Sequence, residues 1–193
     1  LEELDLTISQ LQTQLENLKY QLNNLLGRDY DAELTLGNIP EPDLTFYAQG
    51  NVEKDVDKAE TLSYSLRVKE IELSLMDEDS EYQSVKRQRR MKENEITMEK
   101  NTIRSSLANQ YATIADVKQE YQLLQKQLDL AKTKYDQAAE KFAQGTISEV
   151  EKMQAEQEYL SAKASMENTK IGLFWQIETY RWITNGFISS STT

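Results

Sequence analysis

Apolar residues in the first 25 positions recur every three or four residues, as in a helix that packs along one seam. They are Leu4, Ile8, Leu11, Leu15, Leu18, Leu22 and Leu25, and the steps alternate between 4 and 3. Such a seam needs a second helix to remove it from water. We therefore predict a coiled-coil helix over residues 1–26, ended by Gly27 in the left-handed conformation.

The heptad pattern stops over residues 27–50, where glycine and proline gather. This segment holds Gly27, Gly37 and Gly50, together with Pro40 and Pro42, the only two prolines of the chain. The composition predicts a connector over residues 27–56, with a short extended piece at Glu33–Leu36. Because it also contains apolar residues, we expect the connector to pack against the rest of the protein rather than extend freely into solvent.

Residues 61–76 fit two patterns, since their apolar positions alternate as in a strand and also recur as in a helix. The surrounding Glu, Lys, Leu and Met favour a helix. The acidic sequence DEDS follows at 77–80, and Ser80 with Gln83 fits a capping box. A helix break near 77–80 is therefore plausible, although no glycine or proline enforces it.

Two apolar seams of similar length follow, one on each side of Gly145. The first contains Leu107, Tyr111, Ile114, Val117, Tyr121, Leu124, Leu128, Ala131, Tyr135, Ala138 and Phe142. The second contains Ala155, Tyr159, Ala162, Met166, Thr169, Leu173, Ile177 and Tyr180.

The two seams predict an antiparallel helical hairpin within residues 57–187, whose arms of about 37 residues span about 55 Å each. Its tip lies at 143–148, where Gly145 supplies the left-handed residue and Ser148 with Glu151 forms a capping box. Gly186 ends the second arm, and residues 188–193 are predicted to be a disordered tail. The fold class is thus all-α: a long antiparallel coiled-coil helical hairpin, an additional N-terminal heptad helix and a loop-rich connector.

The arm that enters the tip is longer than the arm that leaves it. Its upstream end must be covered by the first helix, by residues 57–76 or by another copy of the chain. The sequence leaves these three possibilities open.

The composition narrows the possible chemistry. The chain has no cysteine and no histidine, which removes thiolate and imidazole chemistry and the usual zinc ligands. The net charge of −11 argues against nucleic acid as a partner. The sequence D-x-D-x-E at 77–81 resembles the start of a calcium loop, but Tyr82 stands where glycine is required. We expect no catalytic residue, no cofactor, no metal site and no enzymatic activity.

Two further groups of residues each leave two interpretations open. The basic run Lys86, Arg87, Arg89, Arg90 and Lys92 is either a solvated helix face or a contact to acidic headgroups or an acidic neighbouring chain. The aromatic residues Phe174, Trp175, Tyr180 and Trp182 either pack against the connector or form an interfacial belt.

Two stretches resemble the TolC-like outer membrane efflux protein family. Residues 135–186 follow that family's second-repeat hairpin: an aromatic residue, then Gly145-Thr146-Ile147-Ser148, then Ala- and Gln-rich heptads that end in an aromatic residue before Gly186. The sequence QLENLKYQLNNLLGRDYDAELTLGNIPEPDL at 14–44 is similar to the end of its first repeat and to the equatorial connector. The resemblance covers roughly residues 1–76 and 101–187.

The resemblance implies a function and partners. In that family three chains build a hollow helical tube, and the hairpin tips dock end-on with a periplasmic adaptor protein. By position, the docking tip comprises Phe142, Gln144, Gly145, Thr146, Ile147 and Ser148. The resemblance further implies a homotrimer, an adaptor as partner, and a place in the extracytoplasmic cell envelope, associated with the outer membrane or periplasm.

This chain departs from the family between its helices. The family places membrane-embedded strands there, but residues 77–106 are too polar and lack the alternation of such strands. We therefore expect a shortened member of the family, whose association with a membrane is indirect or through a part outside this chain. The alternative function is an adaptor-like or purely structural coiled-coil protein without a channel. A carboxylate-based enzyme is disfavoured, because no mixed α/β pattern that would form a pocket is present.

Overall fold

A computed structural model describes residues 2–35, 37–38, 40–45, 51–78 and 81–187, with side chains from Leu6 onward. The structure is about 80% helical, and the part of the chain that it describes contains no strand. The five helices in this part are α1 (Glu2–Leu25), α3 (Val52–Leu62), α4 (Tyr64–Ser74), α5 (Gln83–Ala143) and α6 (Glu149–Thr184). The prediction of an all-α fold is confirmed. The predicted tail at 188–193 lies outside the described residues.

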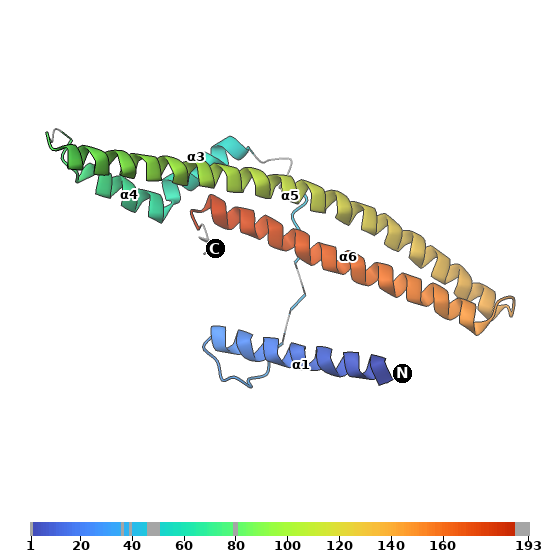
Figure 1. The fold of residues 1–193 in the computed structure, drawn as a ribbon. Coiled ribbons are helices and arrows are strands. Elements are labelled where there is room, and N and C mark those ends of the chain that lie inside the picture. Colours follow the sequence, from blue (N-terminus) through green and yellow to red (C-terminus); the bar gives the residue numbers. More distant parts are fainter. Residues whose placement is uncertain (1, 36, 39, 46–50, 79–80, 188–193) are drawn as a thin grey trace. The chain divides into compact units, whose positions relative to one another are not determined.

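The chain divides into two compact units, Leu1–Ile39 and Pro40–Thr193. The first consists of α1 and the loop that follows it (Figure 1). Gly27 ends α1 with a φ of 66°, as predicted, and the N–H of Arg28 donates to the carbonyl of Asn23 at 2.9 Å. The buried Asn23 side chain also donates to the carbonyls of Tyr30 and Ala32 at 3.1 and 2.7 Å, which holds the loop against the last turns of the helix.

The apolar seam predicted for α1 is exposed to solvent. Its members with described side chains are all exposed: Ile8, Leu11, Leu15, Leu18, Leu22 and Leu25. The partner helix that the sequence predicts for this face is not found within the unit that α1 forms with its loop, so the need for a partner stays a prediction.

In the second unit, α5 and α6 lie side by side and run in opposite directions (Figure 1). The two predicted seams face each other: Leu107, Ile114 and Tyr121 of α5 are buried, as are Leu173, Ile177 and Tyr180 of α6. Nearer the turn, the rings of Tyr135 and Tyr159 stack at 5.7 Å with an interplanar angle of 9°. Gln110 reaches across to the backbone carbonyl of Gln176 at 3.0 Å.

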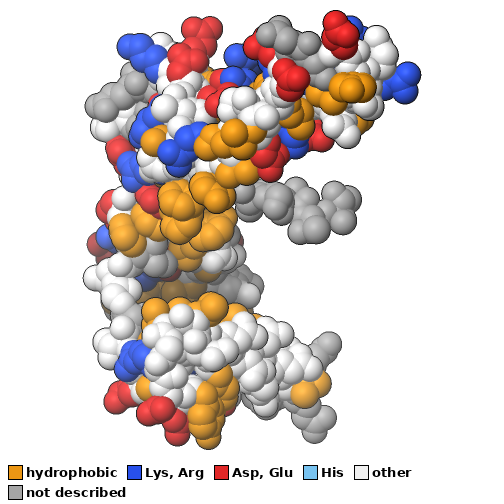
Figure 2. Space-filling model, turned by 90° about the vertical axis from the view of Figure 1, so that its left-hand side faces the viewer, with side chains coloured by type: hydrophobic (Ala, Val, Ile, Leu, Met, Phe, Trp, Pro, Cys, Tyr) orange, Lys and Arg blue, Asp and Glu red, His pale blue; other side chains and the backbone are white. Residues whose placement is uncertain are grey.

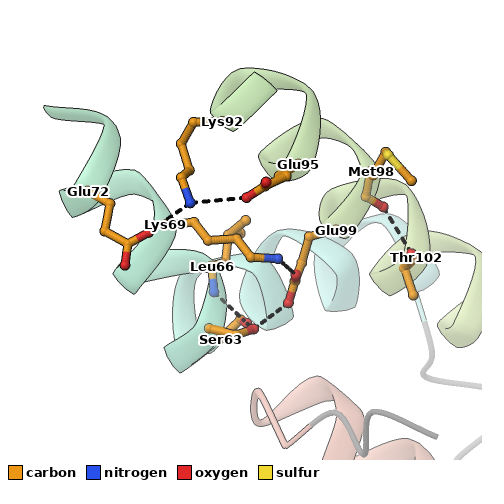
Figure 3. A network of polar contacts seen from close by, with 10 residues as sticks. Ser63, Leu66, Lys69, Glu72, Lys92, Glu95, Met98, Glu99 and Thr102 are labelled. Carbon is orange, nitrogen blue, oxygen red and sulfur yellow. Dashed lines mark hydrogen bonds and ion pairs between the residues drawn. The ribbon is translucent and has the colours of Figure 1, made fainter. Parts of the chain in front are cut away.

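The upstream half of α5 is covered by α3 and α4, so the second of the three possibilities is the one observed. Buried apolar residues join these helices, among them Val56, Leu66, Ile96 and Ile103. Ion pairs surround this core: Lys69 of α4 binds Glu99 of α5, and Lys92 of α5 binds Glu72 of α4 at 2.9 Å (Figure 3).

The helix over residues 61–76 is interrupted at Ser63, which the sequence did not predict. The N–H of Ser63 donates to the carbonyl of Ala59 and ends α3, while its hydroxyl accepts from the N–H of Leu66 and begins α4. The backbone of Ser63 is extended (φ −60°, ψ 115°), so the two short helices meet at an angle that one helix would not allow. The helix favoured over a strand for this segment is confirmed.

The start of α5 also differs from the prediction. The helix begins at Gln83, and Tyr82 occupies the N-cap position without a capping side-chain hydrogen bond. The predicted capping box of Ser80 and Gln83 is therefore wrong, because Gln83 is the first helical residue rather than the third. Ser80 itself lies outside the described residues.

Residues 40–45 of the connector are fastened to the α5–α6 pair, in agreement with the expectation that the connector packs. Asp43 binds Arg181 at 3.0 Å, Glu41 binds Lys170, and the carbonyl of Leu44 accepts from Lys118 at 3.0 Å. Pro42 is buried. Glu33–Thr35, in the other unit, form neither helix nor strand, and Leu36, the last residue of the predicted extended piece, lies outside the described residues.

Among the described residues, no helix combines the length and the apolar character that a membrane span requires.

Candidate functional site: the α5–α6 turn and the outer face of α6

The turn between α5 and α6 reverses the chain through Gly145. Gly145 has a φ of 71°, a left-handed conformation that a side chain makes costly. The N–H groups of Gly145 and Thr146 donate to the carbonyls of Phe142 and Lys141, both at 2.9 Å, and so satisfy the end of α5. The prediction that Gly145 caps this helix is confirmed.

The start of α6 is closed by the predicted capping box. The hydroxyl of Ser148 accepts from the N–H of Glu151 at 3.3 Å, and the Glu151 carboxylate accepts from the N–H of Ser148 at 2.8 Å. The N–H and hydroxyl of Ser148 lower the pKa of Glu151, because both donate to its charged form. Capping hydrogen bonds therefore close the turn at both ends.

The six predicted docking residues lie together at this turn. Five of them are exposed (Phe142, Gln144, Gly145, Thr146 and Ser148), whereas Ile147 is half-buried. The Lys152 ammonium lies over the Phe142 ring, 5.5 Å from its centre, and the Thr146 hydroxyl donates to the carbonyl of Lys141. The turn thus presents a small, polar end surface with a fixed backbone.

A second apolar stripe runs along α6 on the side opposite its buried seam. Its members are exposed and recur at helical spacing: Val150, Met153, Leu160, Ile171, Trp175 and Trp182. We call this set the outer stripe. It is absent from the residues predicted from the sequence, although the steps of 3, 7, 11, 4 and 7 residues place all six on one helix face. Large hydrophobic side chains at the surface are also visible in Figure 2.

The outer stripe ends in an aromatic hollow. A cavity of about 340 Å³ is lined there by Ser106, Trp175, Glu178, Thr179, Trp182, Ile183 and Phe187. The rings of Trp182 and Phe187 are 5.5 Å apart. Of the aromatic residues expected to pack on the connector or to form a belt, Tyr180 is buried against Tyr111 and bonded to Asp55 of α3, whereas the two tryptophans face outward.

The described residues include no group of three or more acidic side chains arranged to hold a metal ion. Within the same residues, the only side-chain N or O atom that is buried without a hydrogen-bond partner is Oδ1 of Asn23, far along the chain from the turn.

No family model, curated protein or solved structure shows significant similarity to this chain.

Proposed function

We propose that this chain is a TolC-like component of a cell-envelope efflux or export assembly and has no enzymatic role. In this proposal α5 and α6 form a coiled-coil hairpin, the helices of several copies stand side by side as the wall of a conduit, and the α5–α6 turn docks an adaptor protein. The mechanism is mechanical, because the wall guides a substrate and transforms none.

The observation that carries the proposal is that α6 has two opposite apolar faces. One face is buried against α5, while the outer stripe lies open to water. A helix inside a wall of helices has a neighbour on each side and needs both faces, whereas a helix of an isolated pair needs only one.

The exposed seam of α1 supports assembly independently. Covering a leucine side chain contributes about 1.5–3 kcal/mol relative to leaving it in water. Within its unit, the seam of α1 has one isoleucine and five leucines exposed, from Ile8 to Leu25. Burial of this seam between copies would therefore contribute a large favourable free energy of association. This fits the homotrimer that the resemblance implies.

The geometry of the α5–α6 turn supports docking. A docking end needs a backbone of fixed shape and small side chains that allow close approach. Gly145 and Ser148 have small side chains. Gly145 sets the backbone at the end of α5, and Ser148 sets it at the start of α6 through the capping box. Gln144 and Thr146 are exposed beside them and can form hydrogen bonds with a partner.

Docking can be tested with a purified periplasmic adaptor of an export assembly and a double variant of the turn. We expect Gln144→Arg with Thr146→Arg to weaken adaptor binding at least tenfold, measured by biolayer interferometry, with an unchanged far-ultraviolet circular dichroism spectrum. Gln137→Arg with Thr133→Arg is the matched control, since both residues are exposed on α5 and lie away from the turn. Equal binding by the double variant and the wild type would reject the turn as the docking site.

A further inference from the structure

The first third of α5 has two faces of opposite character. Its inner face, at Ile96 and Ile103, is buried by α3 and α4. Its outer face is exposed, and the one acidic residue at its edge, Glu93, is paired with Arg89. We call it the arginine stripe; its members are Arg87, Arg90, Asn94, Thr97, Asn101 and Arg104, at steps of 3, 4, 3, 4 and 3 residues.

The structure divides the basic run found in the sequence into two sets. Arg89 and Lys92 turn inward: Arg89 pairs with Glu78 and Glu93 at 3.4 and 3.5 Å, and Lys92 pairs with Glu72 and Glu95 at 2.9 and 3.1 Å. These two residues therefore fasten α5 to its neighbours. Lys86, Arg87 and Arg90 are exposed on the other side of the helix.

The nearby carboxylates are engaged elsewhere. Glu93 is bound to Arg89, Glu95 to Lys92, and Glu99 to Lys69 (Figure 3). Within the part of the chain that the structure describes, Arg87, Arg90 and Arg104 form no ion pair. A chain with a net charge of −11 thus presents a positive face over 18 positions of one helix, about 25 Å long.

Two large apolar side chains flank this face. Met91 and Met98 are separated by one heptad and are 59% and 69% exposed. Arginine beside unbranched apolar side chains is typical of helices that lie at a lipid interface, where the cations meet headgroups and the apolar side chains enter the acyl boundary. An acidic protein segment would satisfy the arginines but would not require the methionines.

We propose that the arginine stripe, with Met91 and Met98, docks onto an anionic lipid surface. The guanidinium groups bind the phosphates of the headgroups, and the methionines insert between them. The Debye length is about 8–10 Å in physiological salt, so the acidic remainder of the chain is screened from this contact. Each cation near such a surface strengthens binding by about fivefold.

This contact would be direct and made by this chain itself, whereas the membrane association expected of a shortened family member was indirect or through a part outside this chain. It does not depend on the proposed conduit, because it uses neither the outer stripe of α6 nor the α5–α6 turn. A chain that binds lipid without assembling, or assembles without binding lipid, would separate the two proposals.

The test is flotation of the full chain with vesicles of phosphatidylcholine and phosphatidylglycerol in equal parts, compared with phosphatidylcholine alone. We expect binding only to the anionic vesicles, and weaker binding as salt rises. The variant Arg87→Gln, Arg90→Gln, Arg104→Gln should lose at least tenfold in affinity. The control Lys126→Gln, Lys132→Gln, Lys163→Gln changes the net charge equally on exposed parts of α5 and α6 and should stay within threefold of the wild type.

Three results would overturn the proposal. The first is no binding to anionic vesicles, and the second is an equal loss in the two triple variants. The third is capture by immobilised polyglutamate without vesicle binding, which would assign the stripe to an acidic protein. Replacing Met91 and Met98 by glutamine should lower vesicle binding further, while leaving any polyglutamate binding unchanged.

Discussion

The hydroxyl of Tyr180 donates a hydrogen bond to the carboxylate of Asp55 at 2.8 Å and thereby joins the end of α6 to α3. Tyr180 is almost fully buried, and its ring lies 6.0 Å from that of Tyr111. This contact fixes the short helices against the point where the α5–α6 pair ends. Loss of it should loosen α3 without affecting the distant turn.

Replacement of Tyr180 by phenylalanine should lower the free energy of unfolding by about 1.5–3 kcal/mol, because the bond is made to a charged group. Urea denaturation followed by circular dichroism measures the change. Tyr64→Phe is the control, since Tyr64 is exposed and should change stability by less than about 0.5 kcal/mol. Similar losses in both variants would show that the bond to Asp55 contributes nothing specific.

The same tyrosine predicts an alkaline limit to stability. Burial, followed by the hydrogen bond and the charge of Asp55, raises the pKa of Tyr180 well above its ordinary value. Its contribution is therefore complete below about pH 10, the ordinary value for tyrosine, and is lost progressively as the pH rises toward the folded-state pKa. The wild type should lose more stability than Tyr180→Phe between pH 9 and pH 11. Parallel losses would contradict the assignment.

An acid-side effect is expected at Glu99. The hydrogen bonds from Lys69 and Ser65 lower its pKa, so its contribution is present above the ordinary pKa of glutamate, about 4.3, and is lost as the pH falls through the lower folded value. Glu99→Gln should be less stable than the wild type at pH 7, and the gap should close as the pH falls to about 3. Denaturant titrations at a series of pH values test this. A gap that is constant with pH would mean that the charge of Glu99 is not what binds α4 to α5.

Three glycines should respond differently to alanine. A Cβ at Gly186 would lie 2.6 Å from the backbone of Leu62, and its φ is 84°, so Gly186→Ala should destabilise by more than about 2 kcal/mol. Gly145 has a left-handed φ but open space around it, so its replacement should cost about 1–2 kcal/mol. Gly172 is helical with nothing near it and should gain about 0.5–1 kcal/mol as alanine. Thermal unfolding of the three variants gives the order, and any other order would contradict this account.

Much of this fold was predictable from the sequence, because helical periodicity and helix ends depend on residues that are only a few positions apart. The seams from Leu107 to Phe142 and from Ala155 to Tyr180 follow from helical periodicity, and the ends at Gly27, Gly145 and Gly186 follow from the conformational freedom of glycine.

Features that depend on tertiary contacts were not predictable in the same way. The break at Ser63 is marked by no glycine or proline, and the capping hydrogen bonds of Ser63 that end α3 and begin α4 are seen only in the structure. The division of the basic run depends on which cations find carboxylates on α4, such as Lys92 on Glu72. The outer stripe of α6 was detectable from its spacing, but the stronger buried seam on the same helix obscured it.

The proposed conduit requires that the full chain assembles. Sedimentation equilibrium measures the assembly state most directly. We predict a trimer at micromolar concentration. Leu160→Gln with Ile171→Gln on the outer stripe should dissociate it while preserving helix content. Leu75→Gln, at a more exposed leucine that follows α4 and lies outside the outer stripe, should leave it intact. A monomer at all concentrations, or a trimer insensitive to the outer-stripe variant, would contradict the central claim.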